Sequence, residues 1–453
     1  MITVADVVGA TIAAQGVVDA FGVIGSGNLV ATNALAAGGA RFHPARHEGG
    51  AICMADGYAR VSGRVGVVSV HQGPGLTNTM TGLAEAAKSR TPVLVLAGET
   101  PAAALTSNFR IDQHDLVESV GAIADRVFSP RTAPDDAQRA YQRALVERRP
   151  VVLMMPIDIQ PLPAENATAP LAPPLPELTP AAPAPEAIEA AAEALARAQR
   201  PAIIAGRGAV IAGAGDELEA LGARIGAVLA TAAPANGLFA GLPYALGISG
   251  GFASPLAAEL LPSADVVLIV GASANHWTTK HGAMIGPDAT VIQVDIDPRA
   301  IGRNRPADLA VLGDAKRATA ALRAQLGAHA NDGFRTPELA GEIASRRWRD
   351  EPYEDASTDE WIDPRTLSIA VDRLLPRDRQ VAVDSGHFLG YPSMYLDVPD
   401  ARSWVFPNGF QASGSAWAAP WARPSPTPAG RRWRRSGTAA PSWPWPSSRP
   451  PRA

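Results

Sequence analysis

Short apolar runs that lead directly into glycine-bearing loops recur along the chain and constrain its fold more than any other feature. Examples are Gly66–Val70 before His71–Gly75, and Val266–Val270 before Gly271. Short, continuously apolar runs are typical of parallel strands buried on both faces of a sheet. The Ala/Leu-rich stretches between them have a helical composition. We therefore predict an α/β fold with doubly wound parallel sheets.

The domain boundaries follow from changes in composition. Residues 161–187 are dense in Pro and Ala, which predicts a semi-extended linker. This linker separates a first domain at 1–160 from a central domain at 188–326. A third domain begins near residue 355 and runs to 412. Three domains also agree with a length of 453 residues, because single hydrophobic cores stop growing beyond about 250–300 residues.

The first domain alternates helix and strand signals. The pattern predicts a helix over about 4–20 and a first strand at Val23-Ile24, followed by a glycine loop. It also predicts a helix from Glu48 to Val61 and another from Thr77 to Ser89. Ligands of such sheets bind beyond the carboxyl ends of the strands, so we expect the intervening loops to share one rim. These loops lie at 25–28, 44–48, 71–75 and 98–101.

Residues 413–453 differ from the rest of the chain. They contain nine Pro, seven Arg and five of the nine Trp, but no Asp, Glu, Ile, Leu or Val. No element of a packed α/β domain has this composition. One interpretation is a disordered Pro/Arg tail. Another is that a GC-rich coding sequence is read in a shifted frame after about Ala412, and inspection of the coding DNA decides between them. The third domain is then incomplete.

Charge and cysteine content narrow the class of protein. The formal net charge of −4 offers no electrostatic footprint for nucleic acid or an anionic membrane surface. A single cysteine, Cys53, excludes an internal disulfide framework. No apolar stretch is long enough to predict a membrane span, and the start of the chain lacks the basic region of a signal peptide. We therefore expect a cytoplasmic protein that binds neither nucleic acid nor membrane.

His47-Glu48-Gly49-Gly50-Ala51 is the most informative local motif, because it opens a predicted helix. A zinc site of the H-E-x-x-H type needs a second histidine at the position of Ala51, so that interpretation is rejected and no metal ligand is predicted. Glu48 alone has a structural interpretation, since a carboxylate in the first turn of a helix interacts favourably with the helix dipole. The following fifty residues point to a further role.

Residues 47–99 resemble the N-terminal, pyrimidine-binding domain of thiamine-diphosphate-dependent enzymes, and within that family acetolactate synthase and its relatives. The resemblance rests on Glu48, Gly57–Arg60, Gly73–Gly75, Thr77-Asn78 and Thr91–Val93, which occur in order at compact spacing. The central segment resembles the family's central domain through Gly206–Gly208, Asp295–Asp297 and Ile301-Gly302. The third segment resembles the start of the diphosphate-binding domain through Asp384–His387 and Asn408–Gln411. The resemblance covers about residues 2–412.

The resemblance implies thiamine diphosphate as cofactor and a 2-oxo acid as substrate. In the family, a glutamate at the position of Glu48 hydrogen-bonds the pyrimidine ring and favours its imino tautomer, so Glu48 is the expected catalytic group. His71 is a second catalytic candidate, because benzoylformate-decarboxylase-like members carry a histidine there. Gln72 and Gln113 are candidates for substrate binding. The residues expected at the cofactor are Gly25, Asn28, Gly73, Pro74, Gly75, Asn78, Gly386, His387, Asn408, Gly409 and Phe410.

The resemblance also implies features that this sequence lacks. Family members anchor the diphosphate through Mg²⁺ held by a Gly-Asp-Gly motif, which does not occur in this chain. The stretch that follows the second strand of flavin-binding members is replaced by Ser273–Trp277, so flavin adenine dinucleotide (FAD) is not expected. A homodimer or homotetramer is expected. Three functions stay open: an acetolactate synthase-like decarboxylation with or without carboligation, a benzoylformate-decarboxylase-like decarboxylation, and an inactive truncated relative that acts as a binding subunit.

Overall fold

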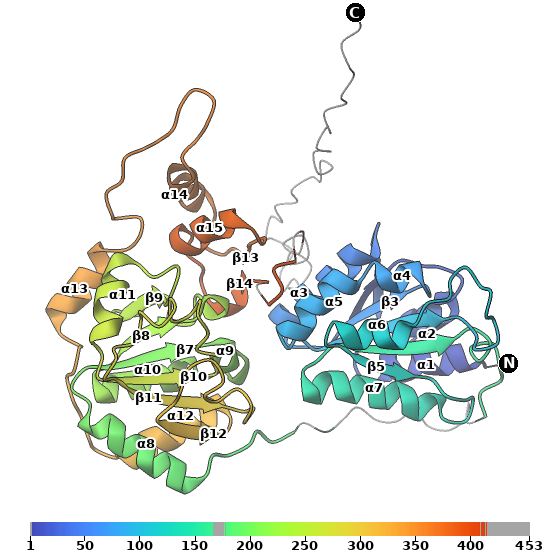
Figure 1. Ribbon diagram of the computed structural model, residues 1–453, viewed down its shortest axis with the longest axis horizontal. Coiled ribbons are helices and arrows are strands. Elements are labelled where there is room, and N and C mark those ends of the chain that lie inside the picture. The colour runs from blue at the N-terminus through green and yellow to red at the C-terminus, as the bar shows by residue number, and fades with distance from the viewer. Residues whose placement is uncertain (1, 166–175, 177, 408, 413, 415–453) are drawn as a thin grey trace, which may run out of the picture.

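The computed structural model describes residues 2–165, 176, 178–407, 409–412 and 414. Two α/β units lie side by side, and a smaller third unit lies next to the central one and reaches toward helix α3 of the first (Figure 1). The predicted tail at 413–453, apart from Gly414, lies outside the described residues, as does Asn408. Within the described residues, no helix is long and apolar enough to cross a membrane.

The first unit is built on a six-stranded sheet with the order β2-β1-β3-β4-β6-β5, and all its strand pairs are parallel. Its central strands are apolar and fully buried, because helices cover both faces of the sheet. The strands are β1 (Asp19–Gly22), β2 (Arg41–Pro44), β3 (Gly66–Val70), β4 (Val93–Glu99), β5 (Ile123–Arg126) and β6 (Val151–Pro156).

Two groups of helices cover this sheet. Helices α1, α2 and α7 form one hydrophobic cluster with one face, and α3, α5 and α6 form a second cluster with the other. The helices are α1 (Val4–Ala14), α2 (Leu29–Ala37), α3 (Glu48–Ser62), α4 (Pro74–Thr77), α5 (Met80–Lys88), α6 (Gln113–Ser119) and α7 (Ala133–Glu147). The unit closes where Thr3 forms an antiparallel bridge with Pro163.

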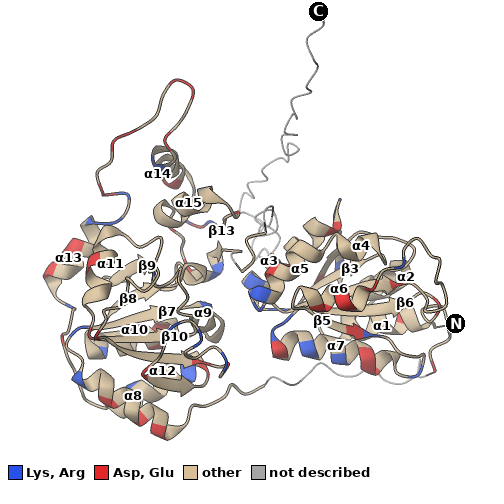
Figure 2. Cartoon of the chain, viewed as in Figure 1, with Lys and Arg blue, Asp and Glu red and all other residues tan. Residues whose placement is uncertain are grey.

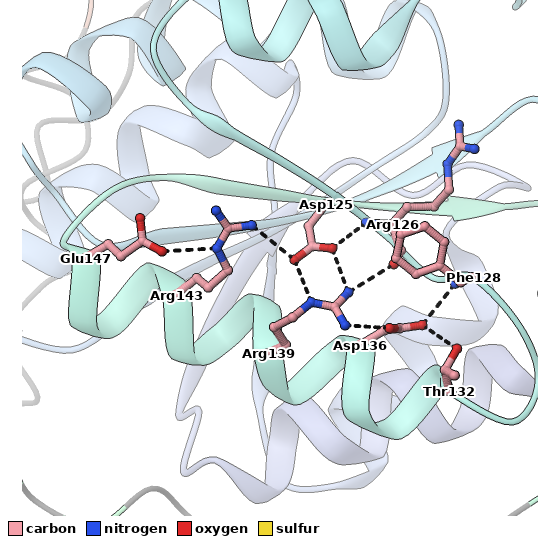
Figure 3. Close-up of polar contacts among 8 residues, drawn as sticks. All are labelled: Asp125, Arg126, Phe128, Thr132, Asp136, Arg139, Arg143 and Glu147. Carbon is pink, nitrogen blue, oxygen red and sulfur yellow. Dashed lines mark hydrogen bonds and ion pairs between the residues drawn. The ribbon is translucent and has the colours of Figure 1, made fainter.

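A polar network fixes α7 on the edge strand β5 (Figure 3). Arg139 donates two hydrogen bonds to the carboxylate of Asp125, at 2.7 and 3.1 Å. Asp136 accepts a bond from Arg139 at 2.7 Å and from the backbone N–H of Phe128 at 2.9 Å. The hydrogen-bonding groups of this network pair with one another, and they lie on the face of the sheet opposite α3. We therefore assign the network a structural role.

The central unit repeats the same architecture with the strand order β12-β11-β10-β7-β8-β9. Its strands are β7 (Pro201–Ala205), β8 (Val228–Thr231), β9 (Ala245–Ile248), β10 (Val266–Val270), β11 (Thr290–Asp295) and β12 (Leu309–Leu312). Its helices are α8 (Pro185–Arg197), α9 (Arg207–Ala212), α10 (Gly215–Ile225), α11 (Pro255–Leu260), α12 (Ala315–Leu326) and α13 (Pro337–Ser345). Helices α8, α9, α10 and α12 pack on one face, and α11 and α13 pack on the other.

The described part of the third unit contains a two-stranded parallel sheet of β13 (Val381–Ala382) and β14 (Trp404–Val405), with α14 (Pro364–Leu374) and α15 (Gly390–Tyr395). An isolated pair of strands is marginal in water, so its stability must come from tertiary packing. Trp404 supplies such a contact, since its indole N–H donates to the carbonyl of Ala233 in the central unit at 2.8 Å. Short 3-10 helices occur at Ala233–Ala235, Leu261–Ser263, His387–Leu389 and Ala401–Ser403.

Arginines join the first unit to the central one. Arg207, at the start of α9, donates to the carbonyl of Ser89 and to the Thr91 hydroxyl in the first unit. Burial lowers the pKa of Arg207 to about 9. Arg90 forms an ion pair with Asp297 of the central unit. Figure 2 shows basic residues at the ends of α3 and α5 that face the central unit, where these contacts occur.

The predicted fold class of doubly wound parallel sheets is confirmed for the first two units, while local boundaries differ. The first helix ends at Ala14 rather than near residue 20, and the first strand is Asp19–Gly22 rather than Val23-Ile24. Gly16 has a φ of 83°, a left-handed conformation that stops the helix early. The central core also extends past the predicted boundary at 326, because Phe334 and Ile343 are part of it.

Candidate active site

The candidate site lies where the chain reverses its direction of winding across the first sheet. Strand β2 pairs with one side of β1 and β3 with the other, so β1 and β3 border a topological switch point. Gly22 at the end of β1 pairs with Ser69 near the end of β3. Loops 23–28 and 71–75 therefore leave neighbouring strand ends, where open α/β sheets bind their ligands.

Glu48 is the first residue of α3, and its carboxylate is oriented by Asn78. The amide nitrogen Nδ2 of Asn78 donates to Oε2 of Glu48 at 2.9 Å. The side chain of His47 caps the helix, since its Nδ1 accepts the backbone N–H of Gly49 at 3.0 Å. Glu48 is half-buried. A carboxylate is favourable at the N-terminus of a helix. The carboxylate of Glu48 is held by Asn78, while the side chain of His47 caps the helix.

Gly75 lies between Glu48 and His71. A Cβ atom at Gly75 would lie 3.1 Å from Cβ of His71 and 3.6 Å from Oε1 of Glu48. A side chain at position 75 would therefore fill the space between the two predicted catalytic groups. The structure thus brings together Glu48, His71, Gly75 and Asn78, while their roles stay predictions.

Both ring nitrogens of His71 have partners. Nδ1 lies 2.8 Å from the carbonyl oxygen of Gln72 and Nε2 lies 3.3 Å from the hydroxyl of Ser26. Since a carbonyl only accepts, Nδ1 carries the proton, and Nε2 of the neutral ring is left as the acceptor. The ring also packs edge-on against Phe109. The sequence did not single out Ser26, although its position in the glycine loop at 25–28 was the available signal.

The side chain of Gln113, at the start of α6, links the loop at 71–75 to the end of β4. Its Oε1 accepts the backbone N–H of Gly73 at 2.9 Å, and its Nε2 donates to the carbonyl of Gly98 at 3.0 Å. Gly73 has a φ of 63°, and a Cβ atom there would lie 2.7 Å from the carbonyl oxygen of Phe109. Both functional groups of the Gln113 amide are thus used inside the protein, and substrate binding by this residue stays a prediction.

Asn28 and Gln72 are also buried among the loops. The Asn28 amide donates to the carbonyl of Val23 and to the Ser69 hydroxyl, and its Oδ1 accepts the N–H of Gly25 at 2.7 Å. Asn28 therefore shapes the glycine loop from within. Gln72 is 3% exposed and fits against Gly27, where a Cβ atom would lie 1.8 Å from its Oε1. Pro74, in contrast, begins α4 and is exposed.

The predicted residues of the third unit lie elsewhere. The backbone N–H groups of Gly409 and Phe410 bind the carboxylate of Glu85, which also pairs with Arg60. Arg60 follows Glu48 by twelve residues in α3, which corresponds to about 18 Å along the helix axis. Gly386 precedes the 3-10 helix His387–Leu389 of the third unit, and His387 is exposed. Within one chain, Gly409 and Phe410 are therefore held at the end of α3 remote from Glu48.

Comparisons with known proteins identify the family of this chain. Residues 2–119 match the family model for the thiamine pyrophosphate enzyme N-terminal TPP binding domain, and residues 188–322 match the model for the central domain. The chain is 31% identical over 419 residues to a sulfoacetaldehyde acetyltransferase from Castellaniella defragrans, covering 87% of this chain and 69% of the relative. The chain belongs to the thiamine pyrophosphate enzyme family.

Other thiamine pyrophosphate enzymes with different named activities are similarly related. A protein named probable 2-ketoarginine decarboxylase from Pseudomonas aeruginosa is 32% identical, with 89% of this chain and 71% of the relative covered. The acetolactate synthase isozyme 3 large subunit of Escherichia coli is 29% identical, with 91% of this chain and 74% of the relative covered. The relatives thus include acetyltransferase, decarboxylase and synthase activities.

In this member of the thiamine pyrophosphate enzyme family, the residues around Glu48 suit the pyrimidine half of the cofactor. Asn78 holds the carboxylate of Glu48, and Gly75 places no side chain against it, which suits a hydrogen bond to a pyrimidine ring. The described residues do not provide a comparable binding site for the diphosphate half of the cofactor. Among the described residues, no group of three or more His, Cys, Asp or Glu side chains could hold a metal ion. The amides of Gly409 and Phe410 already bind a carboxylate, so they offer no pocket for a second anion in this arrangement.

The glycines of the central unit serve close packing. Loops 206–208 and 271–273 leave β7 and β10, which border the switch point of that sheet. The N–H of Gly208 donates to the carbonyl of Gly271 at 2.9 Å. A Cβ atom at Gly206 would lie 2.3 Å from the same oxygen. The two loops therefore press against each other, and glycine is required there whether or not a nucleotide binds.

Proposed function

We propose that this protein takes part in thiamine-diphosphate-dependent decarboxylation of a 2-oxo acid, with or without carboligation to a second carbonyl compound. The observation that carries the proposal is the carboxylate of Glu48, held by Asn78 at the switch point of the first sheet. Membership of the thiamine pyrophosphate enzyme family supports the cofactor.

The roles of the chain's own residues follow from their geometry. Thiamine diphosphate, when bound, supplies a carbon nucleophile and an electron sink for the decarboxylation. Glu48 would hold a proton at the pyrimidine ring, while Asn78 keeps its carboxylate from rotating away. The Nε2 atom of His71, beside the hydroxyl of Ser26, would hold or deliver a proton at the same rim. Gln113 would act indirectly, by fixing the loops that carry these groups.

We further propose that two chains build the complete site. Glu48 and the loop at 409–411 lie at opposite ends of α3, so one chain does not bring them to a common ligand. A dimer in which Glu48 of one chain faces the third unit of its partner would solve this problem. Size-exclusion chromatography with light scattering tests the expected dimer or tetramer.

A simple decarboxylase is the second candidate, and the position of His71 favours it. A histidine at the rim could supply the proton that, in a simple decarboxylation, bonds to the reacting carbon in place of an acceptor substrate. The decarboxylase named among the relatives adds support. Product analysis with pyruvate and with benzoylformate distinguishes the two, since a carboligation forms a new carbon–carbon bond and a decarboxylation releases an aldehyde. We also propose that the central unit functions without FAD, since Ser273–Trp277 replaces the stretch that follows the second strand of flavin-binding members.

Calorimetric titration of the purified chain with thiamine diphosphate and Mg²⁺ is the direct test. Micromolar binding that depends on Mg²⁺ would support the proposal, because a diphosphate needs cationic compensation. Titration without the metal is the control. Absence of binding in both titrations would contradict catalysis by this chain and favour the third candidate, an inactive relative that acts as a binding subunit.

A further inference from the structure

Glu85 of α5 binds three successive backbone N–H groups of the third unit. Its carboxylate accepts from Gly409 at 3.0 Å, from Phe410 at 2.6 Å and from Gln411 at 3.0 Å. Successive amides arranged in this way form a concave nest that binds an anion. The nest is filled here by a side chain more than 320 positions away in the sequence.

The charge of Glu85 is balanced from within the first unit. Arg60, in the last turn of α3, donates to Oε1 of Glu85 at 2.9 Å and to Asp56 at 2.7 Å. The hydroxyl of Ser89 donates to the same oxygen at 2.7 Å. Burial raises the pKa of Glu85, but the Arg60 charge and these hydrogen bonds outweigh it and hold the pKa below its usual value. Glu85 is therefore an anion at neutral pH.

The shape of the loop also fits this position. A Cβ atom at Gly409 would lie 2.4 Å from the hydroxyl oxygen and 2.9 Å from the backbone nitrogen of Ser89. Only a glycine can approach the last turn of α5 so closely. Gln411 adopts a φ of 61°, which is uncommon for a residue with a side chain. Lys88 lies over the ring of Phe410, 5.6 Å from its centroid.

We propose that Glu85 and Arg60 form an interdomain latch that captures the loop at 409–411 and positions the third unit on the first. Glu85 is a positioning residue in this proposal, not a catalytic one. The amides of the loop are satisfied by the protein's own carboxylate, so the loop serves assembly in this arrangement. The proposal does not depend on the proposed function, because both sides of the latch are present in the chain itself.

Hydrogen–deuterium exchange of the full-length chain tests the latch without any cofactor. In Glu85→Gln, the side-chain amide presents one acceptor oxygen and an NH₂ group to three donors, so the nest loses its anion. We expect the amides at 409–411 to exchange at least roughly tenfold faster than in the wild type, as loss of charge-assisted hydrogen bonds implies. Peptides from β3 and β4 should keep their protection.

Glu118→Gln is the matched control, because Glu118 accepts one backbone N–H, that of Ala124, within the first unit. It should leave exchange at 409–411 unchanged. If Glu85→Gln fails to fold, Gly409→Ala provides the second variant, since it leaves the Arg60–Glu85 pair intact and pushes the loop off α5. Faster exchange at 409–411 in a folded Glu85→Gln variant supports the latch, and wild-type exchange rates there overturn it. Gly409→Ala is judged by the same two outcomes only where Glu85→Gln does not fold.

Discussion

Glu48→Gln is expected to lower turnover of a 2-oxo acid by the cofactor-loaded protein by about 10²–10⁴-fold, the usual contribution of a positioned proton-transfer group. Glutamine preserves the size of the side chain and can still accept the hydrogen bond from Asn78, but it cannot hold a proton at the pyrimidine ring. The fold should therefore be spared. Steady-state kinetics measures the loss, and circular dichroism checks the fold.

Glu147→Gln is the control for this experiment. Glu147 ends α7 and pairs with Arg143 on the exposed side of that helix (Figure 3). It should retain the wild-type rate. A second measurement separates binding from chemistry, because the affinity for thiamine diphosphate can be compared between the two variants by calorimetry. Near-wild-type turnover of Glu48→Gln would reject the assignment of Glu48.

Arg60→Ala is expected to destabilise the protein by about 3–5 kcal/mol, the usual result of removing one partner from a buried charged network. The side chain of Arg60 is 7% exposed, and its loss leaves Asp56 and Glu85 without their cation. The midpoint of urea unfolding should fall by roughly 1–2 M, given the usual dependence of the free energy of unfolding on urea. Arg143→Ala removes a partly exposed pair with Glu147 and a longer contact with Asp125, which keeps Arg139, so it should cost about 1 kcal/mol or less.

The effect of Arg60→Ala should depend on pH in a defined direction. Burial raises the pKa of Glu85, but Arg60 and the hydrogen bonds to its carboxylate together lower it more, so the pKa in the folded protein lies below 4.5. A lowered carboxyl pKa contributes stability that is fully present above about pH 4.5 and is lost as the pH falls through the folded value. The difference in stability between wild type and variant should thus narrow below pH 4.5. A difference that widens on acidification would contradict this account of the network.

The sequence predicted what depends on short-range pattern. Strands β3, β4, β7 and β10 are continuous apolar runs, so their burial could be predicted without knowledge of their partners. Glu48, Gly75 and Asn78 belong to one compact motif, and the structure brings them together. The helix expected from Thr77 to Ser89 is interrupted, since α4 ends at Thr77 and α5 begins at Met80.

Features that depend on distant partners could not be predicted. Asp19 falls within the helix predicted over about 4–20. In the structure it lies in β1 and accepts hydrogen bonds from Arg41 and His43 of the neighbouring strand. Glu85 likewise looks like a solvated helix residue until the third unit is placed beside it. Pattern within one element gives no information on such pairs, because their energy comes from tertiary contact.

Helix α3 connects the candidate active site to the latch. Its first residue is the carboxylate proposed for chemistry, and its last turn carries the arginine of the latch. A tilt of about 3° around the Arg60 end would move Glu48 by roughly 1 Å over the intervening ~18 Å. Misplacement of that size can cost a rate factor of about 10². We therefore expect the position of the third unit to affect the orientation of Glu48. A substitution near Arg60 should then change the rate of the reaction.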